Sequence, residues 1–272
     1  MARSATAARR VIDELARSGP HRVLRGDLGL IGMPGVVFTP GGGVGLPAVA
    51  FGHGWLQPTS RYEELLRHLA SWGVVAAAPA TQHGLLPAHR EFATDLRTAL
   101  DMCVGVRLGD GEISVDPDRL ALAGHGMGGG CAVLAAAADQ RCRVVATLAL
   151  AETLPSAVAA AHRATIPGIH ITGGKDRVAP PVAHADQVAK AWAGPVQVRT
   201  LPKASHLGFL QGRHWSDLIL DGSPEYHTRR IARALVTAFL LHHLTGSTEY
   251  DELLETDLPV ATLDLAGRPA PA

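Results

Sequence analysis

The chain has 272 residues, of which 47% are hydrophobic and 4% aromatic, and its 25 basic residues are balanced by 25 acidic ones. A chain of this size and composition can bury a full core without metals or disulfides, so we expect one large domain. The zero formal net charge and the lack of a basic run exclude the electrostatic pattern of a nucleic-acid-binding protein. The longest apolar stretches, residues 144–151 and 235–241, fall short of the roughly 20 residues of a membrane span. We expect neither nucleic acid nor a membrane as a partner.

The N-terminal segment and the cysteine content predict a cytoplasmic protein. Asp13, Glu14 and Arg17 interrupt the continuous apolar run that a signal peptide would need. The three cysteines are odd in number and too few for a disulfide framework, which is typical of a reducing compartment.

The predicted elements begin with an amphipathic helix in residues 1–20, which ends at Gly19 and Pro20. Strands are predicted at about 22–30, 34–39, 47–52, 74–78, 119–123, 144–150, 166–172 and 195–201. Helices are predicted at about 60–72, 86–104, 127–138, 155–163, 182–193 and 225–244. Residues 258–272 are rich in Pro and Ala, and we expect a flexible tail there.

The alternation of these elements predicts an α/β fold. Strands separated by helices of this length indicate crossover units and a mostly parallel sheet with helices on both faces. The first three strands are joined by short Gly/Pro-rich turns, so that end of the sheet should be antiparallel. We therefore predict about eight strands in a single domain that spans residues 21–257.

One strand-turn-helix unit has the spacing of a nucleophile elbow. Residues 119–123 form the predicted strand, Gly124-His125-Gly126-Met127-Gly128 the turn, and the residues that follow a small-residue helix. In a GxSxG elbow the central serine is exposed on a sharp turn above the sheet. Here the central residue is Gly126, which has no side chain with which to attack a substrate. A dinucleotide-binding loop is excluded, because that fingerprint would open the first crossover unit.

The other members of a hydrolytic triad follow in the expected order. Asp176 comes after the predicted strand at 166–172, and His206 comes after the strand that ends near residue 201. The chain order of nucleophile position, acid and histidine is that of α/β-hydrolases. Upstream, the backbone N–H groups at Gly54-Trp55, together with that of Met127, are placed to form an oxyanion hole. No long insertion separates the elbow from the histidine, so we expect little or no lid.

From about residue 47 to 254 the chain resembles the dienelactone-hydrolase, chlorophyllase and cutinase/polyester-hydrolase branch of the α/β-hydrolases. The elbow Gly124-His125-Gly126-Met127-Gly128-Gly129-Gly130 is similar to the GHSMGGG of that branch, and Leu69-Ala70-Ser71-Trp72-Gly73 resembles the helix after its oxyanion segment. The resemblance implies Trp55 and Met127 as oxyanion donors, Asp176 as the acid and His206 as the base.

The chain departs from this branch at two places. Gly126 stands where the nucleophile belongs, and Ala151-Glu152-Thr153 stands where polyester hydrolases carry an aromatic substrate clamp. The secretory signal and C-terminal cysteines of those enzymes are also missing. A polymer substrate is therefore not expected.

Three functional hypotheses remain open at this point. In the first, His206, oriented by Asp176, activates a water that lies where the serine would be, and the protein hydrolyses a small ester, lactone or related carbonyl compound. In the second, the chain is a non-catalytic ligand-binding protein. In the third, it is a serine esterase inactivated at position 126. The retention of Asp176 and His206 favours residual chemistry.

The predicted pocket lies at the carboxyl edge of the sheet, around Trp55, Gly126, Asp176 and His206. His53, His125 and Glu152 are further candidate pocket residues. His242 and His243 have no carboxylate or cysteine at ligand spacing, so we expect no metal and no cofactor. A small molecule is the expected ligand, and the sequence leaves its identity and the oligomeric state open.

Overall fold

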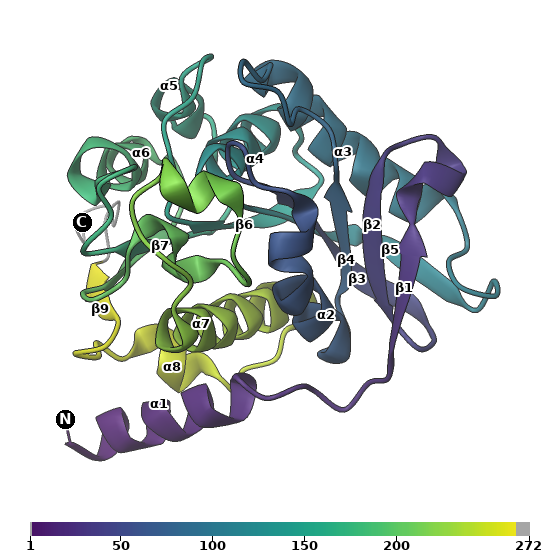
Figure 1. The fold of residues 1–272 in the computed structure, drawn as a ribbon. Coiled ribbons are helices and arrows are strands. Elements are labelled where there is room, and N and C mark those ends of the chain that lie inside the picture. Colours follow the sequence, from purple (N-terminus) through teal and green to yellow (C-terminus); the bar gives the residue numbers. More distant parts are fainter. Residues whose placement is uncertain (1, 265–272) are drawn as a thin grey trace.

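A computed structural model describes residues 2–264, and the centre of this part is one nine-stranded sheet (Figure 1). The strand order is β1-β2-β4-β3-β5-β6-β7-β8-β9. The run from β4 to β8 is parallel, whereas β1, β2 and β9 join at the two edges in antiparallel pairs. The strands are β1 (Val23–Asp27), β2 (Gly35–Pro40), β3 (Gly43–Gly52), β4 (Val75–Pro79), β5 (Ile113–His125), β6 (Cys142–Leu148), β7 (Gly168–Gly173), β8 (Val196–Leu201) and β9 (Thr262–Asp264).

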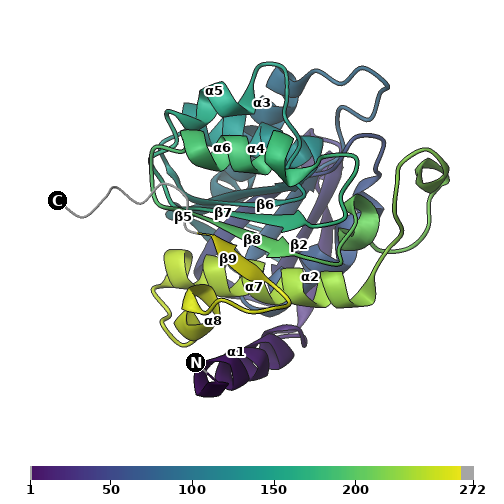
Figure 2. The same ribbon diagram turned by 90° about the vertical axis from the view of Figure 1, so that its left-hand side faces the viewer.

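Helices cover both faces of the sheet, as Figure 2 shows from the side. On one face lie α3 (His89–Gly105), α4 (Met127–Ala138), α5 (Ala157–Ala161) and α6 (Ala185–Ala191). On the other lie α1 (Ala2–Leu15), α2 (Glu63–Ser71), α7 (Tyr226–Thr245) and α8 (Asp251–Glu255). Five 3-10 turns complete the described elements: η1 (Leu28–Ile31), η2 (Thr59–Tyr62), η3 (Pro181–Ala183), η4 (His206–Phe209) and η5 (Trp215–Leu218).

Two apolar cores, one on each face of the sheet, account for these elements. Alternate residues of β5 and β6 point into different cores, so both faces of these strands are buried and their sequences read as continuous apolar runs. α4 is buried almost all round because it lies directly over the sheet, which explains its composition of Gly, Ala, Val and Leu. The α/β-hydrolase fold class predicted from the sequence is confirmed, including the antiparallel edge at β1 and β2.

The two ends of the described chain pack more closely on the domain than the sequence predicts. Ala8, Ile12 and Leu15 of α1 are buried in the same core as α7. At the other end, β9 pairs with β8, so residues 258–264 are not a flexible tail, and residues 265–272 lie outside the described part of the chain. Arg199 of β8 explains this docking, because its buried guanidinium donates to the carbonyls of Leu253, Leu254, Thr256 and Ala261.

No helix among residues 2–264 is both long enough and apolar enough to cross a membrane. No long insertion interrupts the segment from α4 to His206, as expected. The longest irregular segment near the site comes after the histidine, in residues 210–225, and includes η5. Figure 2 shows this segment projecting beyond the first turn of α7.

Candidate active site

The elbow is a turn of one residue between β5 and α4. β5 ends at His125 and α4 begins at Met127, so Gly126 alone makes the turn, with φ 54° and ψ −121°. This positive φ is unfavourable for residues with a Cβ atom. The approach of α4 to the end of β3 is also tight, since a Cβ added at Gly128 would lie 2.2 Å from the carbonyl oxygen of Gly52. The backbone therefore has the sharp conformation of a nucleophile elbow although position 126 is glycine.

Asp176 and His206 form a buried hydrogen-bonded pair. Asp176 follows β7 and His206 opens η4, and the Nδ1–H of His206 donates to Oδ2 of Asp176 over 2.8 Å. The other carboxylate oxygen of Asp176 accepts the N–H groups of Val178 and Ala179 at 2.9 and 2.8 Å. Burial alone would raise the pKa of Asp176, but the hydrogen bonds from His206 and from the N–H of Ala179 hold it below its usual value. Asp176 is thus a carboxylate that fixes the ring of His206.

The second ring nitrogen of His206 faces the elbow. A Cβ atom added at Gly126 would lie 3.1 Å from Nε2 of His206 and 3.8 Å from the Cα atom of Gly54. Because Nδ1 donates its proton to Asp176, Nε2 is the nitrogen with the free lone pair. The space beside Gly126 is therefore directly in front of a base.

Two backbone N–H groups beside this space have no hydrogen-bond acceptor within residues 2–264. That of Met127 is in the first position of α4, where helix geometry leaves it without a partner. That of Trp55 belongs to the loop after β3 and is likewise free. The structure thus brings together the two donors that the sequence suggested for an oxyanion hole.

A cleft of about 400 Å³ opens at this place. Its lining includes four of the residues singled out from the sequence: Trp55, Met127, Glu152 and His206. The remaining lining residues are Leu85, Pro87, His89, Ala151, Val178 and Leu220. The wall is mostly apolar, and Leu220 comes from the segment at residues 210–225. A cleft of this size suits a small organic molecule.

His53 and His125 differ from the expectation that they line the pocket, because both are fully buried behind it. The Nε2–H of His125 donates to the carbonyl of His206, and its Nδ1 accepts the hydroxyl proton of Tyr62. The same hydroxyl accepts the N–H of Gly54 at 2.9 Å. Burial lowers the pKa of His125 to about 3 and that of His53 to about 4, so both rings are neutral. His125 therefore links the histidine turn to the oxyanion loop.

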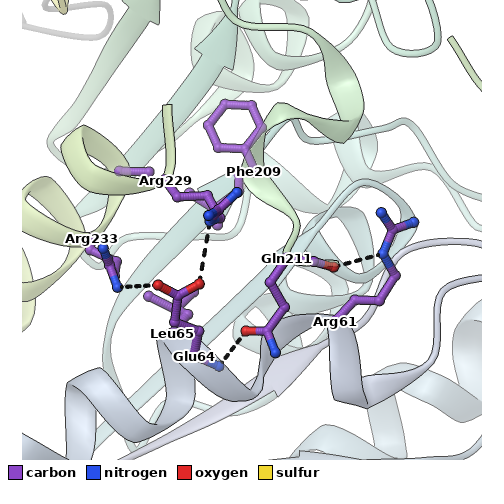
Figure 3. A pocket seen from close by; sticks show the side chains of 9 residues that line it. Arg61, Glu64, Leu65, Phe209, Gln211, Arg229 and Arg233 are labelled. Carbon is purple, nitrogen blue, oxygen red and sulfur yellow. Dashed lines mark hydrogen bonds and ion pairs between the residues drawn. The ribbon is translucent and has the colours of Figure 1, made fainter. Parts of the chain in front are cut away.

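A second connection between distant segments is centred on Arg61. This arginine is 4% exposed and forms an ion pair with Asp217. It also donates to the side chain of Gln57 and to the carbonyls of Gln211 and Gly212. Figure 3 shows Arg61 beside Gln211 in a second pocket, separate from the cleft, in which Glu64 lies between Arg229 and Arg233. A lone arginine in a 3-10 turn has no periodic pattern, so no sequence signal marks it.

A family model described as "PETase: PET hydrolase-like" matches residues 16–207, which contain the elbow, Asp176 and His206. The chain belongs to the PET hydrolase-like family. This match confirms the polyester-hydrolase part of the resemblance seen in the sequence, and the family is one of α/β-hydrolases that act on esters. No curated protein matches the chain. Within residues 2–264 no group of His, Cys, Asp and Glu side chains is arranged to hold a metal ion.

Proposed function

We propose that this PET hydrolase-like chain hydrolyses small esters, lactones or related carbonyl compounds with water as the direct nucleophile. The observation that carries the proposal is the 3.1 Å between Nε2 of His206 and the Cβ position at Gly126. Where other elbows hold a serine side chain, this one leaves space for a water molecule within hydrogen-bonding reach of a base.

The proposed reaction balances with the groups present. Nε2 of His206 takes one proton from water while the oxygen forms a bond to the carbonyl carbon. The N–H groups of Trp55 and Met127 stabilise the resulting oxyanion. When the tetrahedral intermediate collapses, the bond to the leaving oxygen breaks and that oxygen takes the proton from His206. Asp176 stays ionised and stabilises the imidazolium form of His206 between the two proton transfers.

A second candidate is a non-catalytic protein that binds a ligand in the same cleft, and Gly126 is the observation that favours it. Loss of a triad nucleophile costs on the order of 10⁶ in rate, although roughly 10³ to 10⁴ over water survives from the oxyanion hole and binding. The third possibility, a serine esterase inactivated at position 126, is supported by the same observation, the glycine at the nucleophile position. The retained, buried Asp176–His206 pair favours the hydrolytic reading.

The test compares short-chain p-nitrophenyl ester hydrolysis by the chain as it stands, Gly126→Ser and His206→Ala. If the proposal is correct, the unaltered chain turns over and His206→Ala loses roughly 10² or more of the rate. Activity in Gly126→Ser alone would overturn the water mechanism in favour of a binding protein or an inactivated esterase. Equal rates in the unaltered chain and His206→Ala would show that any hydrolysis occurs elsewhere on the surface.

A further inference from the structure

Glu152 places a carboxylate in the mostly apolar lining of the cleft. Glu152 is the only carboxylate among the lining residues, which include no lysine or arginine. It lies in the loop after β6, and its backbone is close to the elbow, because the N–H of the preceding residue, Ala151, donates to the carbonyl of Gly126 over 3.0 Å. Glu152 therefore lines the same cleft as Met127 and His206 at the elbow.

Glu152 is held in place with one oxygen left free. Its backbone N–H donates to Nδ1 of His184 over 2.9 Å, and its Oε2 accepts the N–H of Val158 over 3.2 Å. Its Oε1 has no hydrogen-bond partner in residues 2–264, and the side chain is half-buried. The free oxygen is the one available to a ligand.

No basic side chain in residues 2–264 forms an ion pair with Glu152. The two nearby histidines use Nδ1 to accept backbone N–H groups, His184 from Glu152 and His89 from Leu154, so neither ring donates from Nδ1 to the carboxylate of Glu152. Burial also lowers the pKa of His89. Arg177 is 84% exposed and pairs with Asp221. The negative charge at the cleft is therefore not balanced by the protein.

The cleft also presents an aromatic surface. The indole of Trp55 is 38% exposed, and its Nε1–H donates to the carbonyl of Leu85 over 3.1 Å, which fixes the orientation of the ring. A carboxylate together with an indole face is the combination that attracts a quaternary or primary ammonium group, and the ring contributes most where water is excluded.

We propose that the cleft selects substrates that carry a positively charged ammonium group, and that Glu152 is the residue that recognises this group. The proposal rests on the hydrolase function proposed above, and it adds a substrate class: esters of amino alcohols or amino acids. Anionic esters are disfavoured, because Glu152 would repel them in a partly desolvated cleft.

The first test measures binding and needs no turnover. Choline and its uncharged carbon isostere 3,3-dimethylbutan-1-ol are titrated by calorimetry into the unaltered chain, Glu152→Gln and Asp221→Asn. We expect choline to bind at least about tenfold more tightly than the isostere, and Glu152→Gln to abolish this preference while binding of the isostere is unchanged. Asp221→Asn is the matched control, since it removes a nearby carboxylate outside the cleft lining, and it should leave the preference intact.

Equal affinities in the unaltered chain, a preference that survives Glu152→Gln, or no measurable binding of either probe would overturn the proposal. Thermal unfolding of Glu152→Gln shows whether the variant is folded, and Glu152→Asp tests for partial rescue of the choline preference if it is not.

A second measurement separates this proposal from the hydrolase function. Acetylcholine and 3,3-dimethylbutyl acetate are compared as substrates of the unaltered chain. Selective choline binding without hydrolysis of either ester would reject the hydrolase function and keep the ammonium site. Hydrolysis of both esters at equal kcat/KM, with equal binding of the two alcohols, would keep the hydrolase function and reject the ammonium site.

Discussion

Gly126 has the backbone conformation of a nucleophile elbow but not the nucleophile, whereas a serine at this position would provide both. The φ of Gly126 is 54°, although this residue has no side chain for the turn to expose. Its backbone is held from both sides, because the N–H of Gly126 donates to Leu148 and its carbonyl accepts from Gly129 and Ala151. The conformation is thus set by the β5-α4 unit and the neighbouring strand, and glycine occupies it with little strain.

Replacing Gly126 with alanine should lower the free energy of unfolding by about 1 to 3 kcal/mol, because a Cβ atom is strained at this φ and meets His206 at 3.1 Å. Urea unfolding measures the effect. Gly105→Ala is the control: Gly105 is a helical residue of α3 with open space at its Cβ position, and alanine there should stabilise by up to about 1 kcal/mol. An unchanged stability of Gly126→Ala would show that a Cβ atom is not strained at this φ.

At the scale of elements, the buried pair Arg61–Asp217 joins two segments that both contribute to the cleft. Arg61 lies in η2, after the loop of Trp55, and Asp217 lies in η5, before Leu220. Gln57 strengthens the link by donating to Ser216 over 3.0 Å. η5 is the one 3-10 turn in the described segment at 210–225, and this contact holds η5 against η2.

Asp217→Asn should release this segment, because it leaves the buried guanidinium of Arg61 without its counter-charge, a change that costs roughly 3 kcal/mol or more. We expect amide hydrogen exchange in residues 211–220 to rise by about tenfold or more, while β5 and β6 change little. Glu63→Gln removes the exposed pair Arg25–Glu63 and serves as the control, with an effect near zero. Equal exchange in Asp217→Asn and the unaltered chain would contradict a holding role for the ion pair.

These elements also show what the sequence was able to predict. The eight longer strands and the elbow were predictable because the spacing of apolar residues and the turn residues are local signals in the sequence. β9 was missed since three residues are too few for a periodic pattern, and its pairing depends on Arg199 from a distant strand. The Asp176–His206 pair followed from chain order, whereas the burial of His125 and the contacts of Arg61 depend on packing between distant segments.

At the scale of the whole molecule, buried neutral histidines make stability depend on pH. Burial lowers the pKa of His53 and His68 to about 4, and that of His125 and His170 to about 3. In the unfolded chain each titrates near 6.5, so between these values the unfolded state binds more protons. The contribution of these histidines to the free energy of unfolding is therefore fully present above about pH 6.5 and is lost as pH falls towards 4. The lowered pKa of Asp176 acts in the same direction, but only below about pH 4.

Each such histidine contributes a slope of up to about 1.4 kcal/mol per pH unit, so the free energy of unfolding should fall by about 3 kcal/mol or more between pH 7.5 and 5.5. Urea unfolding at several pH values measures this slope. His170→Gln should reduce it by about one proton, because His170 is fully buried in β7, whereas the exposed His162→Gln should leave it unchanged. A flat profile in this range would mean that the buried rings take up protons without unfolding of the protein. His125, next to the elbow, would then be charged while the site is intact.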